Sequence, residues 1–380
     1  VLVAFIAVTC AHAGNQTSTS IGPYVRCPKG DGPVPPTLEL RFQPRYTHTD
    51  SDADQPQPTW LVPDDRSAKA HYRTRRFRVL AYGDLSSDWA YYAHIRRETD
   101  MDSVEWVDAY LTYGSWDFAD LTIGQFKTPT EASFTVAEMK WPLYEWPRSA
   151  GLLNYDRDWG LMLHDLRRAG GRCGWSVGVF NGEGVNTSEN RSTLLWTARF
   201  DYAANPRLAL GAGYGYNNNT GGNRYRSFLK SGKDPYGFMT YYKAHAVDEE
   251  TWTLDAHYED EHARIFAGYL SKDLSSKLGA MPKADDWYVV GGWKIPCGGD
   301  PEGLEAVVGF ETVDPNTSVR DVYDARFYTI GLNWRPHGTR KDADLFDQVR
   351  LQYQKRDERG GSEVDNDSLV IQYEIQWRYR

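Results

Sequence analysis

Arginine is the residue type whose placement in this sequence best suggests a chemical role. Arg41 and Arg45 are spaced by an even number of residues, and Arg76 and Arg78 lie on either side of Phe77. In a strand this spacing puts the arginines on one face. Grouped guanidinium groups attract anions, since they stay charged at physiological pH and donate several hydrogen bonds. Seven arginines share the pattern: Arg41, Arg45, Arg76, Arg78, Arg96, Arg350 and Arg378.

Patterns for catalysis or metal binding are weak by comparison. Candidate bases exist: His94, His164, His257, Asp108 and Asp255. Their spacing gives no support for a nucleophilic triad, because such residues are common in any chain. The acidic run from Asp50 has Gln55 and Leu61 where a calcium loop needs glycine and glutamate. No CxxC or Cys/His cluster occurs, so we expect no metal, no cofactor and no enzymatic activity.

Composition narrows the class of protein further. The 380 residues carry a formal net charge of -9, which argues against a nucleic-acid-binding protein. Aromatic residues make up 14% of the chain and glycine occurs 34 times, a mixture unlike disordered chains or helical bundles. After residue 14 no apolar run approaches the ~20 residues of a membrane-spanning helix. A membrane β-barrel stays open, because its lipid-facing residues alternate with polar ones.

The start of the chain predicts export. Residues 1–13 are apolar and end in Ala-His-Ala, which is typical of the end of a secretory signal peptide. We interpret residues 14–36 as an N-terminal periplasmic segment. Cys27, Cys173 and Cys297 then form an odd set in an oxidising compartment. Two alternatives stay open, a bridge from Cys27 to one of the other two or three unpaired thiols.

The elements that would carry the arginines are strands. Between Ile371 and Arg380 five apolar residues alternate with five polar ones without error. The same template predicts sixteen antiparallel strands within a barrel spanning residues 37–380, and an even number returns both ends to one side of the membrane. The predicted strands are 37–46, 72–83, 88–97, 103–113, 118–126, 157–166, 173–180, 193–203, 207–216, 250–258, 262–270, 286–294, 304–312, 325–335, 346–355 and 367–379.

Loop lengths give a second test of the barrel. The long connections, 47–71, 127–156, 217–249 and 271–285, all follow odd-numbered strands, whereas the connections after even-numbered strands are short. Bacterial barrels sort their loops in this way, with short periplasmic turns and long external loops. A secreted β-sandwich or propeller would explain the strands without explaining this sorting, and no repeat of fixed length supports propeller blades.

Alternation also predicts which residues face the lumen. Leu38, Leu40 and Phe42 would face lipid, which leaves the arginines of that strand inside, and Thr74 would join Arg76 and Arg78 inside. The first, second, third, fifteenth and sixteenth strands are neighbours once the barrel closes, so their arginines would form one basic wall. The alternative is that each arginine fills a polar lumen and pairs with an acid: Glu39, Glu374 or Asp108.

The loop over residues 127–156 is long and aromatic, and we expect it to fold into the lumen and narrow the pore. On the strand 207–216, Ala209, Gly211, Gly213 and Gly215 would face inward and leave room for a bulky segment, unless they serve local curvature of the sheet. Four charged residues would make the constriction: Glu131, Glu138, Lys140 and Arg148.

Three motifs resemble the phosphate-selective porin O and P family. They are the segments 120–129 (DLTIGQFKTP), 156–164 (DRDWGLMLH) and 178–184 (GVFNGEG), in matching order and spacing. The resemblance covers about 37–380. It implies a sixteen-stranded outer-membrane barrel, usually a homotrimer, with an inward third loop and a basic lumen that conducts anions. The glutamates of the third loop depart from the phosphate-specialised pattern.

These observations predict a Gram-negative outer-membrane porin for passive diffusion of small hydrophilic solutes, with a modest preference for anions and phosphate as one candidate. Its partners would be small anionic or polar solutes, outer-membrane lipid and two further copies of the chain, with no nucleic acid. Glu131 and Glu138 would oppose the arginine wall across the pore. The alternative is a structural or partner-binding barrel that uses the aromatic loop 217–249.

Overall fold

The computed structural model describes sixteen strands, one short helix and the segments that adjoin them. The expected signal segment 1–13, Cys27, Glu138 and most of the loop 217–249 lie outside the described residues. The described ranges are 36–50, 70–99, 101–136, 140–148, 153–165, 172–187, 194–220, 247–276, 279–297, 300–314, 316–318, 320, 324–337, 345–360 and 367–379.

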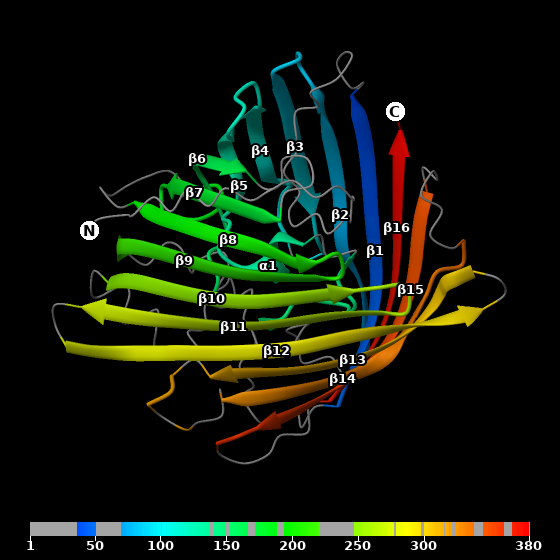
Figure 1. Cartoon of the computed structure of the whole chain (residues 1–380). Coiled ribbons are helices and arrows are strands. Elements are labelled where there is room, and N and C mark those ends of the chain that lie inside the picture. The colour runs from blue at the N-terminus through cyan, green and yellow to red at the C-terminus, as the bar shows by residue number, and fades with distance from the viewer. Residues whose placement is uncertain are drawn as a thin grey trace.

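The strands form one closed antiparallel barrel in which each strand pairs with its neighbours in sequence. Closure comes from β1 and β16, which lie side by side in Figure 1 with Leu40 opposite Trp377. All sixteen predicted strands and the closed barrel are confirmed. The strands are β1 Thr37–Thr49, β2 Ala70–Asp84, β3 Trp89–Arg97, β4 Glu105–Tyr113, β5 Asp120–Lys127, β6 Arg157–Asp165, β7 Cys173–Phe180, β8 Leu195–Asn205, β9 Leu208–Thr220, β10 Val247–Glu259, β11 Ala263–Ser276, β12 Gly279–Cys297, β13 Asp300–Asp314, β14 Ala325–Trp334, β15 Leu345–Glu358 and β16 Ser368–Tyr379.

Burial alternates along the strands as the sequence pattern predicts. On β16 the apolar Ile371 is 42% exposed on the outer face, while its neighbours Gln372 and Glu374 are fully buried. The outer face is therefore apolar and the inner face polar, the reverse of a soluble barrel. The described residues contain almost no helix: α1 spans only Ala132–Thr135, and none of their helices is long and apolar enough to cross a membrane.

A β-bulge on β2 changes the expected facing of one end of that strand. Gln43 of β1 pairs with Arg76, but the next residue, Pro44, pairs with Thr74, so Arg75 is an extra residue. Beyond the bulge Arg73 lies opposite the buried Arg45. The prediction that Thr74 faces the lumen is therefore wrong, because the extra residue reverses the alternation.

The facing of β5, which alternation does not predict, follows from its neighbours. Gln125 would point outward, yet it is buried because its amide donates to the carbonyl of Val107 at 3.0 Å and to Asn186 at 3.2 Å. Lys127 is buried beneath α1, where its amino group donates to the carbonyl of Phe134. Both side chains are thus covered by protein.

Candidate functional site

The seven predicted arginines lie together on five adjacent strands. Arg41 of β1 pairs across to Arg78 of β2, which in turn pairs with Arg96 of β3. Arg45 also lies on β1 and Arg76 on β2, while Arg350 and Arg378 lie on β15 and β16. Six of the side chains are buried or half-buried, and that of Arg378, near the end of its strand, is 39% exposed. We call this set, with Arg75, the arginine wall.

Carboxylates are more closely interleaved with the arginine wall than alternation suggests. Glu39 lies between Arg41 and Arg378, at nitrogen–oxygen distances of 2.5 and 2.8 Å. Glu374 lies 3.3 Å from Arg350. The alternative that single arginines pair with an acid of the lumen therefore applies to these residues. Arg96 likewise has two acids within ion-pair distance, Glu98 and Glu105.

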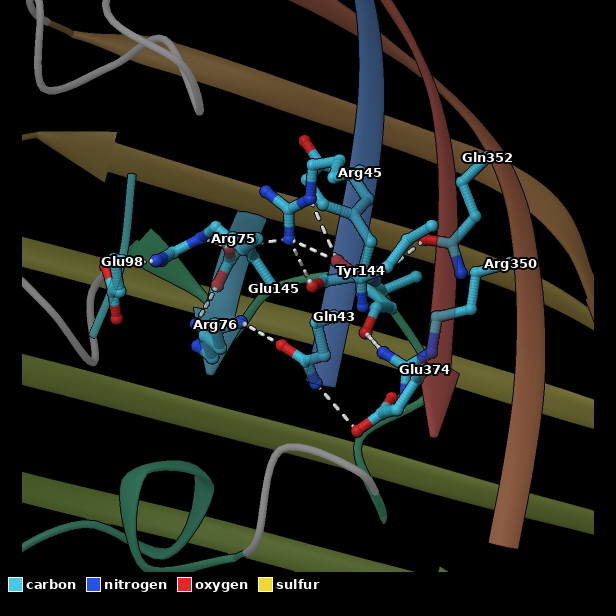
Figure 2. A network of polar contacts seen from close by, with 12 residues as sticks. Gln43, Arg45, Arg75, Arg76, Glu98, Tyr144, Glu145, Arg350, Gln352 and Glu374 are labelled. Atoms are coloured by element: carbon cyan, nitrogen blue, oxygen red, sulfur yellow. Dashed lines mark hydrogen bonds and ion pairs between the residues drawn. The ribbon is translucent and has the colours of Figure 1, made fainter. Parts of the chain in front are cut away.

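The densest cluster is centred on Glu145 of the third loop. Its Oε1 accepts from Arg45 Nη2 at 2.8 Å and from Arg75 Nε at 2.6 Å, and its Oε2 accepts from Arg76 Nη2 at 2.7 Å. Arg75 also donates to Glu98 at 2.8 Å. Figure 2 shows the three guanidinium groups approaching one carboxylate from two strands. Within the described part of the chain, three cations therefore share two carboxylates here.

Electrostatics keep this carboxylate ionised. Burial alone would raise the pKa of Glu145, but the guanidinium groups of Arg75, Arg76 and Arg45 hold it well below its usual value of 4.5. Hydrogen bonds from three charged donors favour the ionised form in the same direction. Glu145 thus stays ionised and does not act as a proton donor.

The residues next to Glu145 attach the loop to the strands β1 and β15. Tyr144 donates its backbone amide to Gln352 of β15 at 2.9 Å, and Arg45 donates to the carbonyl of Tyr144 at 3.1 Å (Figure 2). The guanidinium of Arg45 also lies 5.1 Å from the centre of the Tyr144 ring. Arg350 donates to the carbonyl of Leu143. These contacts join the loop to β1 and β15.

Glu131, in the same loop as Glu145, contacts α1 and β12. Its carboxylate accepts from the amides of Ser133 and Phe134, both at 2.9 Å, and so caps α1. It also accepts from the hydroxyl of Tyr288 on β12 at 2.7 Å. Burial and the nearby Asp255 raise the pKa of Glu131. Glu131 therefore anchors the loop to a part of the barrel away from the arginine wall, and its opposition to that wall across the pore stays a prediction.

The other charged loop residues also contact the far strands. The backbone amide of Arg148 donates to Glu311 of β13, and its guanidinium donates to Gln354 of β15 at 2.7 Å. Its guanidinium lies 4.3 Å from the centre of the Phe327 ring. The side chain of Lys140 is exposed, while its carbonyl accepts from Arg264 at 2.5 Å. The charged residues of the loop thus contact strands that the sequence pattern did not predict.

The glycines of β9 lie against the two ends of the loop. A Cβ at Gly213 would lie 1.8 Å from the carbonyl oxygen of Thr130, and one at Gly215 would lie 2.2 Å from the ring of Tyr155. Thr130 is held there because its carbonyl accepts from Thr253 of β10 at 2.5 Å. The absent side chains leave the space that the loop occupies.

The remaining ionisable groups point to structural roles. His94, Asp108 and Arg157 form a buried chain in which both contacts to Asp108 are 2.8 Å long. No group of three or more potential metal ligands occurs in the described part of the chain. Two functional candidates were not among the predicted site residues, Glu145 and Arg75. The bulge that turns Arg75 inward has no signal in the alternation.

A family model described as phosphate-selective porin O and P matches residues 52–379, which is nearly the whole chain. No curated protein matches the sequence. The match and the closed barrel both point to a channel of the outer membrane rather than an enzyme.

Solved porins share the fold at low sequence identity. An anion-selective porin from Comamonas acidovorans is 13% identical with a TM-score of 0.57, covering 90% of this chain and 99% of its own. OprB of Pseudomonas putida is 14% identical with a TM-score of 0.59, covering 92% and 94%. The trimer form of in-vitro-folded OmpT of Vibrio cholerae is 13% identical with a TM-score of 0.56, covering 90% and 99%. At these identities the likeness establishes the fold alone.

Proposed function

We propose a modest anion preference for this chain, which belongs to the phosphate-selective porin O and P family. Family and barrel together make it an outer-membrane channel for small solutes. The apolar outer face suits lipid and the polar inner face suits a water-filled passage. Whether the channel favours anions or cations depends on the charged residues that line it.

The observation that carries the proposal is the excess of guanidinium over carboxylate in the arginine wall. Arg45, Arg75 and Arg76 share Glu145 and Glu98, and Arg41 and Arg378 share Glu39. Among the described residues each group thus contains more guanidinium groups than carboxylates, although the whole chain carries a net charge of -9. An ion inside a narrow pore responds mainly to the charges that line it, because low-dielectric walls focus the field.

We further propose that the third loop folds inward and narrows this passage. Support comes from its contacts with inward-facing residues of separate strands, namely Arg45 of β1, Gln352 of β15 and Tyr288 of β12. Glu145, Lys140 and Arg148 would then contribute charges of both signs at the constriction. Mixed charge suits a general anion preference better than strict selection of phosphate.

Export and assembly are part of the same proposal. Residues 1–13 would direct the chain to the outer membrane of a Gram-negative bacterium and be removed. Three copies would meet through outward apolar residues of the first and last strands and their neighbours. Phe42 of β1 and Phe77 of β2 are examples, which pack edge to face at 6.4 Å and are each about 40% exposed. The OmpT relative forms a trimer. Mass photometry in mild detergent should give three times the mass of the chain, and a monomer would contradict this.

Planar-bilayer recording tests the channel proposal. In a KCl gradient at low salt the reversal potential should have the sign of a chloride-preferring pore, and the preference should fade as salt rises, because screening acts over about 8–10 Å at physiological ionic strength. A pore that favours potassium at low salt would overturn the proposal.

A further inference from the structure

Glu145 occupies a position that suits a carboxylate brought by a solute. We propose that Arg45, Arg75 and Arg76 form a binding site for the carboxylate group of small organic acids, and that Glu145 fills this site while no solute is bound. The inference rests on the proposed anion preference and names the class of solute behind it.

The geometry of the site is that of a carboxylate receptor. The donors are divided between the two carboxylate oxygens, two to Oε1 and one to Oε2, at 2.6 to 2.8 Å. Such short, charge-assisted contacts are the strong kind, and guanidinium groups match the planar carboxylate particularly well. A free organic acid presents the same two oxygens, so it can replace the side chain of Glu145 atom for atom.

The charged donors of the site belong to the barrel rather than to the loop. The β-bulge at Arg75 of β2, which lies opposite Gln43 and Pro44 of β1, lets the consecutive residues Arg75 and Arg76 reach the same carboxylate. Without the extra residue, consecutive side chains would point to opposite faces. All three donors therefore stay in place when the loop releases Glu145.

The surroundings hold the donors in position. Gln372 of β16 accepts from Arg45 Nε at 2.8 Å and from its Nη2 at 2.5 Å. Gln43 accepts from Arg76 Nη1 at 3.1 Å. The Nη1 atom of Arg45 is buried with no hydrogen-bond partner among the described residues. A buried donor without a partner is costly, so Arg45 has hydrogen-bonding capacity that Glu145 does not use.

A solute in the lumen can reach the site, and Glu145, which fills it, is tethered because it belongs to the loop. The side chain of Glu145 is 15% exposed, so a solute can approach the carboxylate. A tethered ligand competes with a free one at an effective concentration in the millimolar range or above. Removal of the negative charge of Glu145 should therefore uncover the affinity of the three arginines.

An organic acid fits better than inorganic phosphate because the site has an apolar side. The ring of Trp146 lies 5.4 Å from the guanidinium of Arg76, and Tyr144 lies against Arg45. Aromatic rings can pack against the carbon chain of an organic acid, while phosphate has no apolar part to place there.

The test is block of single-channel current by propionate, which reproduces the glutamate side chain. We expect Glu145→Gln channels to bind propionate at least about ten-fold more tightly than wild type, because the internal competitor is neutralised. Adding Arg75→Gln to this variant should return the affinity to the wild-type level. The neutral isostere propionamide should not block any of the channels.

A matched control removes a different buried carboxylate. Glu249→Gln neutralises an acid of β10 that pairs with Lys272 at 3.3 Å, away from the arginine wall, and should leave propionate affinity unchanged. Equal affinities in Glu145→Gln and wild type, an equal gain in Glu249→Gln, or phosphate block as strong as propionate block would each overturn the inference. An anion-preferring pore without propionate binding would refute only this inference, whereas a cation-preferring wild type refutes the proposed function.

Discussion

Gly213 of β9 gives a direct test of how the third loop is held. An alanine there would place its Cβ 1.8 Å from the carbonyl oxygen of Thr130, and the two atoms must move apart by about 1.6 Å to reach ordinary contact at 3.4 Å. Both sides are backbone, so no side chain can rotate away. The hydrogen bond from Thr253 to Thr130 would be lost with the movement. Overpacking costs about 1–3 kcal/mol and the hydrogen bond about 1 kcal/mol, so we expect a loss of about 2–4 kcal/mol.

Urea unfolding, followed by tryptophan fluorescence and by heat-modified migration on gels, measures this loss. Gly291→Ala is the matched control, because a Cβ at Gly291 of β12 has its nearest neighbour at 3.7 Å. We expect the control to unfold at the wild-type midpoint and Gly213→Ala to unfold at lower urea. Equal midpoints for the two variants would refute the packing of Thr130 against β9.

Two further predictions concern the loop carboxylates. Because the folded pKa of Glu145 is lowered, its ion pairs contribute stability above the unfolded value of 4.5 and lose it as pH falls through the folded value. The difference in unfolding free energy between wild type and Glu145→Gln should thus be constant from pH 8 to pH 5 and shrink below 4.5; a decline already between pH 7 and pH 6 would contradict this. Tyr288→Phe removes a hydrogen bond to the buried Glu131 and should cost about 1–3 kcal/mol in urea unfolding, while Tyr328→Phe on the outer face should cost almost nothing, and equal midpoints would count against the anchor.

The strands and their facing could be predicted from the sequence because a membrane barrel imposes a strict rule on each residue. Every lipid-facing position must be apolar, so ten residues such as those from Ile371 to Arg380 determine both the strand and its inner face. The arginine wall followed from the same rule, since closure of β16 onto β1 brings distant parts of the chain together. The row of glycines on β9 could be placed on the inner face for this reason too.

Alternation carries no information about features that interrupt it. The bulge at Arg75 depends on one extra residue in the pairing of two strands, and the sequence of β2 reads equally well without it. The loop glutamates posed a different difficulty. Glu131 and Glu145 carry the same charge within one loop, and only the tertiary contacts decide that Glu131 caps α1 while Glu145 contacts the arginines.

The central claim is that the arginine wall sets the ion preference of the pore. The most direct measurement is the reversal potential in a low-salt KCl gradient for wild type and for the combined variant Arg41→Glu, Arg76→Glu and Arg78→Glu. We predict a chloride preference for wild type and a shift toward potassium for the variant, because the field of the lining residues changes sign. A wild type that already favours potassium, or a variant whose reversal potential does not move, would contradict the account.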